Sequence, residues 1–89
     1  MTRILVVDDS AVDRRLVGAV LEQNDEWTID FAETGREALE KIEENYPDAI
    51  VADLQMPEMN GLELVKVITR RVPVIPVILI MDRPYMGHA

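Results

Sequence analysis

Short apolar runs alternate with amphipathic segments along the 89 residues, and this alternation constrains the fold more than any other feature. Continuous runs at 3–9, 48–53 and 74–80 are typical of strands that are covered on both faces. The run at 28–32 alternates apolar and polar residues, which predicts an edge strand. Helical periodicity separates these four runs. The sequence therefore predicts an α/β domain whose four-stranded parallel sheet has right-handed crossovers and helices on both faces.

Three polar residues mark the points where the predicted helices begin. Ser10, Thr34 and Asn60 each precede an apolar-periodic segment, and an acidic residue follows each of them three positions later. The first of these helices is expected to end by Asn24. The apolar faces are formed by Val12, Leu16, Val17, Ala19, Val20 and Leu21 in the first helix, Ala38, Leu39 and Ile42 in the second, and Leu64, Val65 and Ile68 in the third.

Composition excludes several classes of protein. A net charge of −8 opposes binding to a phosphate backbone, so we expect no nucleic-acid partner and favour a cation or a basic surface. The chain has no cysteine, which rules out a disulfide framework and a thiolate metal site. The last apolar run is too short to span a bilayer and is interrupted by Pro76. We therefore expect a soluble, cytoplasmic protein with no membrane partner.

Three aspartates stand at the ends of predicted strands. Asp8 and Asp9 end the first strand, and Asp53 ends the third. Sites in open parallel sheets form beyond the carboxyl ends of the strands, where these side chains can meet. Converging carboxylates repel one another, and a hard cation such as Mg²⁺ relieves that repulsion. An acidic pair after a strand also serves as an ordinary helix-entry turn, so Asp8 and Asp9 alone leave both interpretations open.

Four segments carry a resemblance to a known family: ILVVDDS, FAETGREAL, PDAIVADLQMPEMNGLELV and PVIPVILI, which together cover about residues 3–80. With them the chain resembles the receiver domain of two-component response regulators. The resemblance implies a flavodoxin-like fold with strand order 2-1-3-4, lacking the family's fourth helix, fifth strand and fifth helix. Residues 1–81 would form a truncated receiver domain, and residues 82–89 an irregular tail.

The same resemblance implies a role for each site residue. Asp53 would accept a phosphoryl group from a histidine kinase or phosphotransfer protein. Asp9 would bind Mg²⁺ directly, Asp8 mainly through water, and Gln55 through its backbone carbonyl, and Asp53 would also belong to the metal site. The role is that of a signalling module, so we expect no enzymatic activity and no output domain.

Two features of the family are missing from the sequence. The hydroxyl residue that ends the family's fourth strand is replaced by Met81, whose thioether donates no hydrogen bond. Receiver domains also have a lysine at the end of a fifth strand. This lysine has no counterpart here, because Lys41 and Lys66 fall within predicted helices. Both groups would stabilise charge on the phosphoryl group, so we expect slower transfer and an impaired switch.

The last strand also predicts a partner. Val74–Ile80 would form an uncharged edge, which natural sheets usually protect. We expect a homodimer in which a second copy covers this edge and the adjacent sheet face, edge to edge or by segment swapping.

Three functions remain open from the sequence. The first is a Mg²⁺-dependent phosphoacceptor, acting for example as a phosphate sink. The second is a homodimeric interaction module or decoy that keeps the receiver fold and is not phosphorylated. The third is a degenerate fragment that arose by truncation. Retention of the three aspartates favours the first function, and loss of the hydroxyl and lysine favours a passive role.

Overall fold

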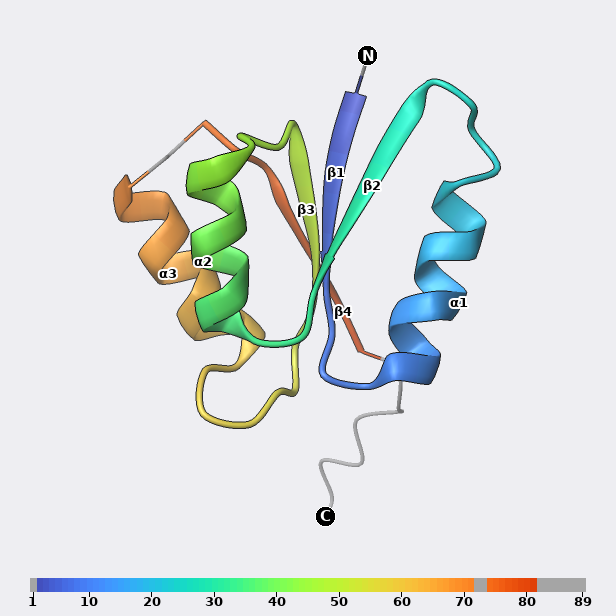
Figure 1. Cartoon of the computed structure of the whole chain (residues 1–89). Helices are drawn as coiled ribbons and strands as arrows, with labels where there is room; N and C mark the ends of the chain where they lie inside the picture. The colour runs from blue at the N-terminus through green and yellow to red at the C-terminus, as the bar shows by residue number, and fades with distance from the viewer. Residues whose placement is uncertain (1, 72–73, 82–89) are drawn as a thin grey trace.

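The computed structural model describes residues 2–71 and 74–81, in which four parallel strands form one sheet in the order β2-β1-β3-β4 (Figure 1). The strands are Thr2–Val7 (β1), Trp27–Ala32 (β2), Ala49–Asp53 (β3) and Val77–Ile80 (β4), and the helices are Ala11–Leu21 (α1), Gly35–Glu44 (α2) and Gly61–Arg71 (α3). The predicted flavodoxin-like architecture and strand order are confirmed. The predicted tail, 82–89, lies outside the described residues. Within them, no helix is long and apolar enough to cross a membrane.

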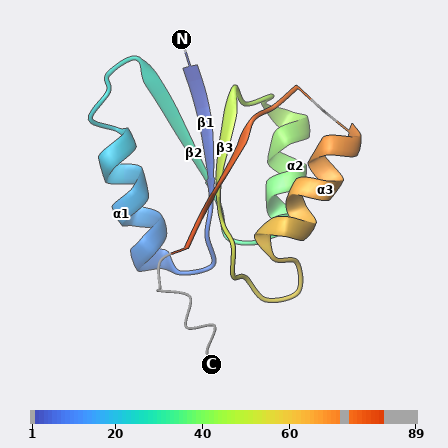
Figure 2. The same ribbon diagram turned by 180° about the vertical axis from the view of Figure 1, so that it is seen from behind.

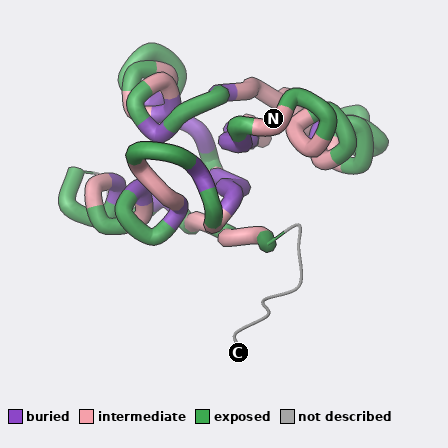
Figure 3. Tube along the Cα trace, turned by 90° about the horizontal axis from the view of Figure 1, so that it is seen from below, coloured by how far each residue is buried: buried purple, intermediate pink, exposed green. Residues whose placement is uncertain are grey.

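The helices form two layers around the sheet. Helix α1 lies on one face, and α2 and α3 lie on the other (Figures 1 and 2). Successive side chains of a strand point to opposite faces. In β1, Leu5 and Val7 therefore join the core under α2 and α3, while Ile4 and Val6 face α1, and all four are buried. Figure 3 shows the buried residues concentrated on the sheet and on the inner sides of the helices.

The predicted helix caps are present. The side chains of Ser10, Thr34 and Asn60 accept hydrogen bonds from the backbone N–H groups three residues later, at 3.2, 3.0 and 2.9 Å. The cap of α3 is reciprocal, since the backbone N–H of Asn60 donates to Glu63 Oε1 at 3.0 Å. These caps fix where α1, α2 and α3 leave the edge of the sheet at which the strands end.

The apolar face predicted for α1 does not pack inward. Its exposed members are Val12, Leu16, Ala19 and Val20. The large side chains among them are 61–68% exposed. The buried position is instead Gly18, where an added Cβ would lie 2.6 Å from the Phe31 ring. Because glycine allows this close approach to β2, α1 turns its Gly18 side to the sheet and leaves the apolar stripe outside.

Strand β4 is shorter than the sequence suggested. The prediction of Val74–Ile80 is wrong in its first part, since the strand begins at Val77. Pro76 has no N–H to donate, so a regular ladder cannot extend through it. Its carbonyl still accepts a hydrogen bond from the backbone N–H of Ile50, at 3.0 Å, which anchors the entry of β4 to β3.

Candidate metal centre

The three predicted aspartates meet at the carboxyl edge of the sheet, which is the lower edge in Figure 1. Strands β1 and β3 are neighbours, so the residues that follow them lie side by side. One carboxylate oxygen from each of Asp8, Asp9 and Asp53 lies within 4.8 Å of the others. Asp8 is fully buried, Asp53 is nearly so, and Asp9 is exposed. The cluster is therefore open to solvent on the Asp9 side.

Two tight turns hold the buried carboxylates. Asp8 Oδ1 accepts a hydrogen bond from the backbone N–H of Ser10 at 2.9 Å, and Asp53 Oδ1 accepts one from that of Gln55 at 3.0 Å. These are turns in which an aspartate bonds the backbone two residues ahead. Among the described residues Asp8 Oδ2 has no hydrogen-bond partner, although it is buried. A buried acceptor without a partner is costly, and a bound cation would satisfy it.

Burial raises the pKa of Asp8 from its ordinary value of 3.8 to about 6. The Ser10 N–H acts in the opposite direction, and the negative charges of Asp53, Asp13 and Asp9 add to the increase. At neutral pH Asp8 is therefore mostly ionised, but at a free-energy cost. A cation between the carboxylates removes that cost, and an all-oxygen set of this kind suits Mg²⁺. The residues present fit that ion.

The segment after Asp53 folds back over the strand end. The N–H of Leu54 donates to the carbonyl of Ile80 at 2.8 Å, and the N–H of Gly61 donates to the carbonyl of Leu54 at 3.0 Å. A Cβ at Gly61 would lie 2.6 Å from the backbone oxygen of Asp53, so this approach requires glycine. Between them Glu58 adopts a φ of 69°, in the left-handed region that non-glycine residues rarely occupy. The loop is thus held by backbone contacts, at the cost of one strained residue.

An open cavity of about 550 Å³ lies between Asp9 of the acidic cluster and the loop that follows β3. It is lined by Asp9, Leu54, Gln55, Met56, Pro57, Asn60 and Leu62. A group that reaches the aspartates can therefore enter beside the loop that follows β3.

Sequence reasoning missed Arg14. Its Nη1 donates to the backbone carbonyl of Asp8 at 2.8 Å, which ties α1 to the end of β1. No local pattern in the sequence indicates this contact, because it depends on how α1 lies against the end of β1. Gln55 is placed next to the cluster by its N–H, whereas the role of its carbonyl as a metal ligand stays a prediction.

The two departures from the receiver pattern lie where the sequence placed them. Met81 directly follows β4 and is 43% exposed. Lys66 lies in α3, and Lys41 lies in α2, where its Nζ donates to the backbone carbonyl of Phe31. Neither lysine follows a strand. The impaired switch that we inferred from these positions stays a prediction.

Comparison with known proteins identifies the arrangement. Residues 4–84 match the family model described as response regulator receiver domain. The chain is 44% identical over 79 residues to the protein-glutamate methylesterase/protein-glutamine glutaminase of Treponema denticola, and 46% identical over 86 residues to the second protein of that name in Carboxydothermus hydrogenoformans. These alignments cover 88% and 96% of this chain, but only 21% and 24% of the relatives.

Solved structures agree with the sequence comparison. The response regulator domain of Thermotoga maritima CheB superposes with a TM-score of 0.84 at 36% identity, and covers 100% of this chain and 66% of its own. The chemotaxis protein CheY4 of Vibrio cholerae gives a TM-score of 0.84 at 32% identity, with 96% and 72% covered.

The relatives also correct one expectation. We expected no enzymatic activity, yet the curated relatives carry the name of an enzyme, a methylesterase and glutaminase. The sequence alone could not indicate such an enzyme, because the chain spans only about a fifth to a quarter of the length of the relatives quoted.

Proposed function

Because the chain belongs to the response regulator receiver domain family, we propose that Asp53 is a Mg²⁺-dependent phosphoacceptor in two-component signalling. One observation supports this above all: Asp8, Asp9 and Asp53 converge within 4.8 Å, and the buried Oδ2 of Asp8 has no hydrogen-bond partner among the described residues. Such a set is poorly stable without a cation and well suited to one.

The chemistry follows from the positions of these side chains. Asp9, Asp8, Asp53 and the carbonyl of Gln55 would hold the ion, which neutralises negative charge on the phosphoryl group when bound. A carboxylate oxygen of Asp53 attacks phosphorus, the bond from phosphorus to the donor breaks, and the donor keeps the electron pair. The Gln55 N–H holds the carboxylate of Asp53 in place during this transfer.

The proposed donor is a phosphohistidine on a kinase or phosphotransfer protein. We place the exchange in the cytoplasm, in keeping with a chain that has no cysteine, and assign the receiver domain to residues 1–81. A net charge of −8 favours a basic protein surface over nucleic acid as the partner.

Labelling by a small acyl phosphate, followed by intact-protein mass spectrometry, tests the proposal. One phosphoryl group should be added in the presence of Mg²⁺ and none in EDTA. Asp53→Asn should abolish the addition, whereas Asp25→Asn, an exposed aspartate in the turn after α1, should leave it unchanged. Equal labelling of wild-type protein and Asp53→Asn would refute the assignment.

The names of the relatives suggest what this receiver controls. We propose that the phosphorylation state of Asp53 regulates a protein-glutamate methylesterase or glutaminase activity, as these relatives are named. Addition of the phosphorylated chain to the T. denticola relative, shortened by the segment that this chain matches, should change its rate of methyl ester hydrolysis, and Asp53→Asn should not. An identical rate with both proteins would contradict this part of the proposal.

The edge of β4 favours a second function, homodimerisation. The carbonyls of Pro76 and Ile80 point to β3, so by alternation the N–H and C=O groups of Val77 and Leu79 point away from it. The strand carries no charge, and Ile78 is 55% exposed. A second copy could pair antiparallel with this edge and cover the adjacent face. Light scattering should then give a dimer, which Ile78→Lys dissociates; a monomer at micromolar concentration would contradict the proposal.

A further inference from the structure

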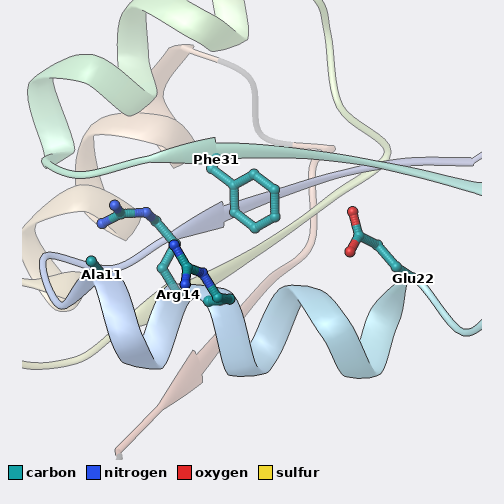
Figure 4. Close-up of a pocket in the computed structure, with 5 residues that line it drawn as sticks. Ala11, Arg14, Glu22 and Phe31 are labelled. Atoms are coloured by element: carbon teal, nitrogen blue, oxygen red, sulfur yellow. The ribbon is translucent and has the colours of Figure 1, made fainter.

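A second cavity of about 340 Å³ lies between α1 and β2. It is lined by Ala11, Arg14, Arg15, Glu22 and Phe31. Figure 4 shows the ring of Phe31 between the side chain of Arg14 on one side and the carboxylate of Glu22 on the other. Its volume falls at the lower end of the range of small-molecule sites, about 300–1,000 Å³. The cavity thus has a cationic end, an aromatic wall and an anionic end.

Within the part of the chain that the structure describes, the two arginines of this cavity have no acidic partner. The chain has 17 acidic and 9 basic residues, yet among the described residues neither Arg14 nor Arg15 forms a salt bridge. Arg14 donates to a backbone carbonyl instead, that of Asp8. Arg15 is exposed and Arg14 is half-buried, so their remaining N–H groups can donate to a bound anion.

The charge at the C-terminal end of α1 opposes the helix dipole. Cations are favourable near the C-terminus of a helix and anions near its N-terminus. Arg14 and Arg15 follow Asp13, whose charge is favourable in the first turn, whereas Glu22 is the C-cap, where an anion is unfavourable. Helix stability therefore does not explain the position of Glu22. The order of charges suits instead a ligand that carries an anion at one end and hydrogen-bond donors at the other.

We propose that this cavity binds a purine mononucleotide. The guanidinium groups of Arg14 and Arg15 bind the phosphate, which matches their forked geometry. The purine ring stacks on Phe31, and Glu22 accepts hydrogen bonds from its edge. Eight residues separate Arg14 from Glu22, about 12 Å along a helix, so the cationic and anionic ends of the cavity can contact opposite ends of one ligand. Guanine offers a carboxylate two adjacent donors and adenine one amino group, so GMP should bind more tightly than AMP.

Titration of isotope-labelled protein with GMP, followed by NMR, tests the proposal. EDTA is included so that no metal bridges the phosphate to the aspartates, and low salt limits screening. Saturable shift changes are expected for the backbone amides of Gly18, Glu22 and Phe31. Arg15→Gln and Glu22→Gln should each weaken GMP binding by about tenfold or more, since each removes a charged hydrogen bond.

Matched variants and ligands separate this site from other anion binding. Arg70→Gln and Glu44→Gln change exposed residues on α3 and α2 and should leave GMP affinity unchanged, as should Asp53→Asn. Guanosine and inorganic phosphate should each bind much more weakly than GMP. No saturable response, shifts confined to residues near Asp53, or equal affinity for GMP and inorganic phosphate would each overturn the proposal.

Discussion

Replacement of Asp8 by asparagine should stabilise the metal-free protein at neutral pH. Asp8 is fully buried, and its pKa is raised from 3.8 to about 6. Since a change of one pKa unit corresponds to about 1.36 kcal/mol, ionised Asp8 costs about 3 kcal/mol of folding free energy. Asparagine has nearly the same shape and keeps an oxygen for the Ser10 N–H. The substitution should therefore recover up to about 3 kcal/mol, or more than about 10 °C in Tm.

The pH dependence has a definite sign. A raised pKa means that the folded protein binds the Asp8 proton more tightly than the unfolded chain does. The contribution of protonated Asp8 to the stability of the folded protein is fully present below about pH 4 and is lost as the pH rises to about 6. The free energy of unfolding of the metal-free wild-type protein should contain this decrease. Asp8→Asn should lack it.

Urea unfolding at about pH 4 and about pH 7.5, with EDTA or with Mg²⁺, measures both effects. Mg²⁺ should stabilise the wild-type protein at the higher pH, because it binds the folded state, and should have much less effect on Asp8→Asn. Asp25→Asn serves as a control in which an exposed aspartate loses the same charge. The reasoning fails if Asp8→Asn is less stable than wild type in EDTA at about pH 7.5.

Two further substitutions test the local structure. Glu58→Gly should stabilise the protein by about 0.5–1 kcal/mol in urea unfolding, because glycine adopts the positive φ without strain, whereas the same change at helical Glu40 should destabilise it by about 1 kcal/mol. Destabilisation at both positions would contradict the first expectation. Lys41→Met should lose about 1 kcal/mol through the missing bond to the Phe31 carbonyl, and Lys66→Met, on an exposed part of α3, should lose little; equal losses would remove the assigned role of Lys41.

Features set by neighbouring residues were predictable from the sequence. The caps at Ser10, Thr34 and Asn60 depend on residues three positions away, and all three are present. The convergence of Asp8 and Asp53 followed from one further rule, that parallel strands expose their carboxyl ends at the same edge. Local patterns together with this rule therefore located the acidic cluster.

Features that depend on packing between distant segments were not predictable. Periodicity shows that Leu16 and Val20 share a face of α1, but it does not show which face meets the sheet. That choice depends on the contact of Gly18 with Phe31, thirteen residues later. The bond from Arg14 to the carbonyl of Asp8 likewise requires the position of α1 relative to β1.

The most direct test of the central claim is to locate the phosphoryl group. After reaction with a small acyl phosphate, borohydride reduction converts an aspartyl phosphate to a stable product that peptide mass mapping can find. The account predicts this product at Asp53, only when Mg²⁺ is present, and its loss when Asp8 and Asp9 are both replaced by asparagine. A product at another residue, or one that forms equally well in EDTA, would contradict it.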